Sequence, residues 1–280
     1  VAISTDGGYY AKRHLDCLTE HKIPIILSAE SAFSLKLAKK NTIIPICYGD
    51  SLETLFFKQC KVPNVLASRN GTVSGTAIDL FLNITTSAIL TGGLDLCTNK
   101  EFLHVNPNIL EEIDRVQDNC IRPISTRIAE NSFKTGSLSV YRLWFQNLDS
   151  KKSKRIFRLY ADPDKQTHLS GIKDITFTSA KNLIETDFQP ITICNSKIID
   201  NHSLKISLQN FLVHIQKNVS TYEYNTLFME NAALVEMLLS KKYPENKQYL
   251  ETAKTKTDHF IQTLLNKIDL PINTVSKEDF

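Results

Sequence analysis

Polar turns that contain glycine or a carboxylate follow several apolar runs early in this sequence. The first, Thr5-Asp6-Gly7-Gly8, has two adjacent glycines that let the backbone approach a phosphate or a sugar closely. The next two turns are Ser28-Ala29-Glu30-Ser31 and Gly49-Asp50-Ser51. Their carboxylates are suited to binding ribose hydroxyls or to acting as a general base. Helix capping is an equally simple role for Asp6 and a more frequent one for each of the others taken singly.

The strongest local signal lies between residues 68 and 95. Asn70-Gly71-Thr72 follows an apolar run and opens the stretch TVSGTAIDLFLN, in which Gly75 and Ala77 would allow a helix to pack closely on a sheet. The next apolar run, AILTGG, delivers Asp95 at its end. A strand, a glycine turn, a helix with small residues, a second strand and an acidic turn together form the pattern of a nucleotide-binding half-unit.

Parallel strands are needed to bring these turns together. Apolar runs of strand length span residues 1–4, 23–28, 42–48, 62–67 and 87–92, and amphipathic stretches span 9–21, 31–40, 52–59 and 72–83. Strands that are apolar throughout and alternate with helices predict an α/β fold with a doubly wound, mainly parallel, Rossmann-like sheet. In such a sheet, ligands bind beyond the carboxyl ends of the strands, where helix N-termini supply amides.

The second half of the chain becomes helical. A helical pattern covers 108–128, an aromatic-rich helix is expected at 138–148, and a strand at 154–160. After residue 203 three apolar helical faces follow, with Pro244 between the second and the third. We therefore predict a Rossmann-like domain over 1–180 and a small helical C-terminal subdomain over 181–280. Since Val1 opens directly on a strand, the first domain is expected to be incomplete at its N-terminus.

The composition argues against several classes of protein. The net charge of +3 comes from 33 basic and 30 acidic residues that are well mixed, so no nucleic-acid partner is predicted. No apolar run approaches the roughly 20 residues of a membrane span. The six cysteines form no C-x-x-C pair, which argues against a disulfide framework and a zinc site. Free thiols favour a reducing compartment, and we expect a cytoplasmic protein without a metal site.

The segment NGTVSGTAIDLFLNITTSAILTGGLDLC resembles part of the motility accessory factors. There it reads as a glycine-serine/threonine-valine turn, an alanine-rich helix, and a strand ending in a glycine-x-aspartate-leucine turn. Three further pieces resemble that family in the same order: ILSAESAFSLKLAKKNTIIPICYGDS, LSVYRLWFQNL and RIFRLYADPDKQTHLSGIKDI. The resemblance covers roughly residues 1–180. Motility accessory factors are flagellin glycosyltransferases whose central domain is related to bacterial sialyltransferases and to an archaeal pterin diphosphokinase.

The resemblance implies a transferase that moves a nonulosonic (sialic-like) acid from a CMP-linked donor to a Ser/Thr hydroxyl of flagellin, in support of flagellar assembly and motility. The nucleotide-sugar is then a substrate, and no cofactor is required. With Ser28 and Ser51 added from the same turns, the predicted substrate-binding residues are Asp6, Gly7, Gly8, Ser28, Glu30, Ser51, Asn70, Gly71 and Thr72. The candidates for the general base are Asp95, Asp50 and His104, although a single histidine in a loop is more often structural.

Two departures from the family pattern keep other functions open. The family's first loop is usually glycine-proline-serine-leucine, whereas this chain has Asp6-Gly7-Gly8-Tyr9, and a later glycine-rich turn is altered to Asp162-Pro163-Asp164 and Gly171. One alternative is a non-catalytic protein that binds flagellin or another flagellar partner. The other is a pterin diphosphokinase-like enzyme, in which Asp50 and Asp95 would hold Mg²⁺ beside bound phosphates.

Overall fold

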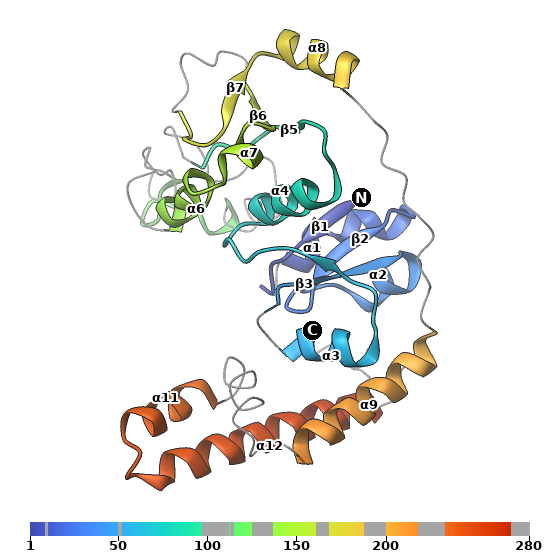
Figure 1. The fold of residues 1–280 in the computed structure, drawn as a ribbon, viewed down its shortest axis with the longest axis vertical. Coiled ribbons are helices and arrows are strands. Elements are labelled where there is room, and N and C mark those ends of the chain that lie inside the picture. The colour runs from blue at the N-terminus through green and yellow to red at the C-terminus, as the bar shows by residue number, and fades with distance from the viewer. Residues whose placement is uncertain are drawn as a thin grey trace. The chain divides into compact units, whose positions relative to one another are not determined.

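A computed structural model describes residues 1–8, 11–49, 52–96, 112, 115–124, 137–160, 168–187, 200–217 and 233–269 (Figure 1). The chain divides into two compact units. The first comprises residues 1–43 and 67–194, and the second comprises 44–66 and 195–280. The predicted division at residue 180 stays a prediction.

The first sheet contains four short strands in the order β1-β2-β3-β4. They are β1 (Ala2–Ser4), β2 (Ile25–Ser28), β3 (Ile43–Cys47) and β4 (Val65–Leu66). β1 pairs with β2 in parallel, with Ile3 opposite Ile26, and β3 pairs with β4 in parallel. All four residues of β2 are buried, as expected for an apolar strand covered on both faces. Each of these strands lies within the apolar run that predicts it.

A second parallel sheet has the order β5-β6-β7, with β5 at Ile89–Thr91, β6 at Ile156–Leu159 and β7 at Lys173–Ile175. Helix α4 (Val73–Ile84) follows β4 in the sequence but contacts both β1 and β5. Helix α4 therefore contacts one strand of each of the two parallel sheets, in agreement with the predicted α/β fold. Ile78, Leu82, Ile89 and Ile156 share a buried core with Phe145.

The first unit contains further helices besides α4. They are α1 (Ala11–His14), α2 (Leu35–Lys40), α6 (Ser137–Gln146), α7 (Ser150–Ser153) and α8 (Phe177–Asp187). The stretch predicted as one helix over 9–21 is instead α1 followed by a 3₁₀ segment, η1 (Asp16–Glu20). The backbone amides of Leu15, Leu18 and His21 each bond to the carbonyl three residues earlier, the tighter 3₁₀ pattern.

The second unit contains α3 (Leu52–Cys60), α9 (Asn201–Lys217), α11 (Leu234–Lys242) and α12 (Lys247–Asp269). Phe211, Leu212 and Ile215 of α9 are buried with Ile261 of α12. Phe56 of α3 packs against the Phe211 ring, with 5.4 Å between the ring centroids. Pro244 lies between α11 and α12, as predicted. The first and third predicted apolar faces are confirmed by their shared core. The second is not, because Leu227 and Phe228 lie outside the described residues and Val235 and Leu238 are exposed. No helix in the described ranges is long and apolar enough to cross a membrane.

Candidate functional site

The turns after β1 and β2 are bonded to each other within the first unit. The amide of Ala32 donates to the carbonyl oxygen of Asp6 at 2.9 Å. A Cβ atom added to Gly7 would lie 2.5 Å from the Glu30 carbonyl oxygen, so only glycine fits there without displacing the neighbouring turn. The Asp6 carboxylate accepts a hydrogen bond from the Gly8 amide at 2.8 Å, which fixes the shape of the first turn. The two turns therefore form one surface.

Ser28 lies beneath that surface. Its hydroxyl oxygen is 2.9 Å from that of Ser31, and the Ser31 hydroxyl donates to the Ser4 carbonyl oxygen at 2.6 Å. Ser28 and Ser31 are both buried. The geometry thus gives Ser28 a supporting position under the ends of β1 and β2.

Arg69 links the turn after β2 to the turn after β4. Its Nη1 and Nη2 atoms donate to the two carboxylate oxygens of Glu30 at 3.0 and 2.7 Å, a bidentate pair. The hydrogen bonds from Arg69 hold the pKa of Glu30 below its ordinary value. Both side chains remain partly exposed, at 37% for Arg69 and 54% for Glu30. Their charged groups therefore lie at the surface of the site, where a ligand can reach them.

Helix α4 begins at this surface, in a turn stabilised by its own side chains. The buried Asn70 accepts through Oδ1 from the Thr72 amide at 3.2 Å, and the Thr72 hydroxyl caps the helix by accepting from Gly75 at 2.8 Å. Gly71 has φ +85° and faces the Tyr141 ring, leaving no room for a side chain. The sequence predicts that Gly75 makes room for close packing of the helix on the sheet. In the structure, Gly75 makes room for the Asn70 side chain, because an added Cβ would lie 2.5 Å from Asn70 Oδ1.

The contribution of the Glu30–Arg69 pair to the free energy of unfolding should depend on pH. Because the folded-state pKa of Glu30 is lowered, this contribution is complete above the unfolded-state pKa and is lost as the pH falls through the lower, folded value. For a surface pair we expect a coupling of about 0.2–1 kcal/mol at pH 7. A double-mutant cycle with Glu30→Gln and Arg69→Met, read from denaturant unfolding at pH 7 and pH 3, measures it. A coupling that is equal at both pH values would contradict the assignment.

Asp95 belongs to a network of charged and aromatic side chains on the second sheet. The Tyr160 hydroxyl donates to Asp95 Oδ1 at 2.5 Å. The guanidinium of Arg158 lies 4.5 Å from the centroid of the Tyr160 ring, and its Nη1 donates to the Leu94 carbonyl oxygen at 3.2 Å. Asp95, which follows β5 in the chain, is thereby bonded to the residue directly after β6.

The same guanidinium holds Asp174 of β7. Arg158 Nε and Nη2 donate to the two carboxylate oxygens of Asp174 at 2.6 and 2.9 Å, and the Arg158 side chain is fully buried. His168 completes the network, with Nδ1 3.4 Å from Asp174 Oδ2. Sequence reasoning missed these residues. In the sequence, Arg158 was a charged residue within one predicted strand, and Asp174 lay in a stretch that was not predicted as a strand, so no pattern indicated a buried pair.

Three predicted residues, Asp50, Ser51 and His104, lie outside the described residues. The structure brings Asp6, Gly7, Gly8 and Glu30 together, and it joins them through Arg69 to the turn that contains Asn70, Gly71 and Thr72. Asp95 lies in the separate network on the second sheet. Across the described ranges, no three His, Cys, Asp or Glu residues are grouped so as to hold a metal ion. Cys17, Cys47, Cys60 and Cys120 are free thiols.

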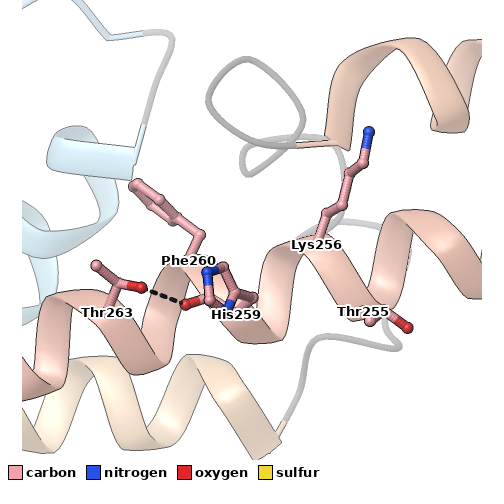
Figure 2. Close-up of a pocket in the computed structure, with 5 residues that line it drawn as sticks. All are labelled: Thr255, Lys256, His259, Phe260 and Thr263. Carbon is pink, nitrogen blue, oxygen red and sulfur yellow. Dashed lines mark hydrogen bonds between the residues drawn. The ribbon is translucent and has the colours of Figure 1, made fainter.

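A shallow hollow on α12 contains none of the predicted site residues. It is lined by Thr255, Lys256, His259, Phe260 and Thr263 (Figure 2). The Thr263 hydroxyl bonds to the His259 carbonyl oxygen of its own helix at 2.8 Å, and Lys256 pairs with Glu236 of α11. Since ligand sites are concave and combine polar groups from several elements, a hollow with all its lining residues on one helix is a weaker candidate than the strand-end turns.

The chain is similar over its length to one curated protein. Over 276 residues it is 26% identical to an uncharacterized protein of Treponema pallidum (strain Nichols), and the alignment covers 96% of this chain and 62% of that protein. The chain therefore spans less than two thirds of that relative. No protein-family model and no solved structure matches the chain.

Proposed function

We propose that this chain is a glycosyltransferase of the motility accessory factor type. Its substrate would be a CMP-linked nonulosonic acid, and its acceptor a Ser/Thr hydroxyl of flagellin. The donor would bind over the turns after β1, β2 and β4. One observation carries the proposal: three turns that the sequence predicts as ligand-binding turns contact one another. Gly7 packs against the Glu30 carbonyl oxygen, and Arg69 forms an ion pair with Glu30.

The charges at these turns suit such a donor. A CMP-linked nonulosonic acid carries a phosphate and a carboxylate, and a guanidinium binds either group in a bidentate manner. Arg69 offers that guanidinium, and Glu30 offers a carboxylate that can accept from ribose hydroxyls. The start of α4 adds the positive end of the helix dipole beside Asn70 and Thr72. In this arrangement, donor phosphate competes with Glu30 for Arg69.

Arg69→Gln should weaken the binding of CMP and of CMP-N-acetylneuraminic acid at least tenfold. The expectation follows from the loss of a charge-assisted hydrogen bond, which is worth about 1.5–3 kcal/mol. Isothermal titration calorimetry of the purified chain measures the effect. Lys36→Gln is the matched control, since Lys36 is an exposed cation of the same unit that pairs with Glu20 at 3.4 Å and lies outside the turns.

A folded wild-type chain that binds neither compound at millimolar concentration would refute the transferase proposal. The non-catalytic alternative would then lead. It has its own structural support, because Asp6 and Glu30 already bond to Gly8 and Arg69 within the protein. Mg²⁺-dependent nucleotide hydrolysis would instead favour the diphosphokinase-like enzyme.

A further inference from the structure

We propose that the ring of Tyr141 is the surface on which the nucleobase of the donor stacks. This inference rests on the proposed function and deepens it, because it assigns the part of the site that recognises the cytosine of CMP. The turns supply a guanidinium at Arg69, a carboxylate at Glu30 and the amides at the start of α4, which suit phosphate and ribose groups. An aromatic base binds best where a flat apolar surface is also present.

Tyr141 adjoins the turn after β4. It lies on α6, far from that turn in the sequence, yet its ring contacts Gly71, the residue between Asn70 and Thr72. Gly71 and Tyr141 belong to the same compact unit, and α6 contacts α4. The ring is therefore fixed beside the start of α4, in the turn that also carries Arg69.

The distances to Gly71 show how the ring is oriented. A Cβ atom added to Gly71 would lie 2.3 Å from Cε1, 2.8 Å from Cδ1 and 3.5 Å from Cζ of Tyr141. For a planar six-membered ring, these three distances place the added atom close to the ring plane and beyond the ring edge. Gly71 therefore meets the edge of the ring, and neither face of the ring is covered by this glycine.

The surroundings of Tyr141 leave the ring open to a ligand. The residue is partly exposed. Among the residues that the structure describes, none stacks an aromatic ring or a cation on Tyr141, and none bonds to its hydroxyl. A nucleobase stacks on the face of such a ring, which strengthens binding by about five- to 150-fold per base. Because stacking depends on the ring and not on the hydroxyl, phenylalanine should replace Tyr141, whereas leucine should not.

The test uses the full chain, with CMP affinity measured by calorimetry and the cytosine H5 and H6 protons followed by NMR. Tyr141→Leu should weaken CMP binding about tenfold or more, and Tyr141→Phe should stay within about twofold of wild type. Ribose 5-phosphate, which lacks the base, should bind all three proteins equally. Tyr243→Leu is the matched control, since Tyr243 is a partly exposed tyrosine of the second unit.

The NMR signals report stacking directly. At saturating CMP, both cytosine protons should move upfield with the wild-type chain and with Tyr141→Phe, because an aromatic ring then lies against the base. With Tyr141→Leu this shift should be lost. If Tyr141→Leu does not fold, the wild-type chain decides alone, and bound CMP without an upfield shift overturns the inference.

Failure of the inference differs from failure of the proposed function. If Tyr141→Leu binds CMP with wild-type affinity and the same upfield shift, the base binds elsewhere and the transferase proposal stands. An equal loss of CMP and ribose 5-phosphate affinity would show that Tyr141 only supports the turn. If the wild-type chain does not bind CMP, the proposed function fails, and the role of Tyr141 fails with it.

Discussion

Replacing Arg158 with methionine is expected to lower the free energy of unfolding by about 3–5 kcal/mol, because it leaves the Asp174 carboxylate largely buried without its opposite charge. The Arg158 side chain is fully buried and that of Asp174 is 9% exposed. Methionine is apolar and unbranched, so it occupies much of the same space but replaces none of the hydrogen bonds. The loss would also leave the Leu94 carbonyl oxygen without the bond from Nη1.

Equilibrium unfolding in urea measures this effect, with Arg69→Met as the matched control. Both arginines form bidentate bonds to a carboxylate, but the Arg69 pair is partly exposed, so its loss should cost less than about 1 kcal/mol. The double variant Arg158→Met/Asp174→Leu should recover part of the stability, since an apolar pair removes the unpaired buried charge. If Arg158→Met costs no more than Arg69→Met, the buried pair contributes little.

Much of the α/β organisation was predictable from the sequence because it depends on local patterns. β2 and β3 lie in continuous apolar runs, and α4 begins one residue after the predicted start at Thr72. β7 was not predicted. Its sequence, Lys173–Ile175, contains a single apolar residue, and the strand exists through pairing with β6, which lies more than a dozen residues earlier. A strand that depends on such long-range pairing need not show an alternating apolar pattern in its own sequence.

The part of the candidate site formed by the turns after parallel strands was predictable from the sequence. Parallel strands bring their carboxyl ends to one edge, so Gly7 and Glu30 were expected to be neighbours. The role of Arg69 was not foreseen, because its partner is 39 residues away and no spacing rule connects them. Arg158 was missed for a different reason. A charged residue in a strand usually faces solvent, and only its register with Asp174 and its burial reveal the network.

Gly171→Ala is expected to lower the free energy of unfolding by about 2–5 kcal/mol, a loss comparable to that of Arg158→Met. Two separate costs add at this position. Gly171 has φ +89°, where an L-residue costs about 1–2 kcal/mol, and an added Cβ would overlap the backbone carbonyl of Phe145. Phe145 is fully buried, so the carbonyl cannot move aside without shifting α6, and overpacking of this kind costs about 1–3 kcal/mol.

Gly92 and Gly93, which are adjacent in the sequence, allow the two costs to be measured separately. Gly93 has only the positive φ, and Gly92 has neither the positive φ nor a close neighbour. Gly93 has φ +70° with nothing within 4 Å of an added Cβ, so Gly93→Ala should lose only the conformational part, about 1–2 kcal/mol. Gly92 also has open space and no positive φ, so Gly92→Ala should change stability by less than about 1 kcal/mol. Urea unfolding of the three variants should rank them Gly171, Gly93, Gly92. Equal losses for Gly171→Ala and Gly93→Ala would mean that α6 yields to the added methyl group and that its contact with the turn before β7 is loose.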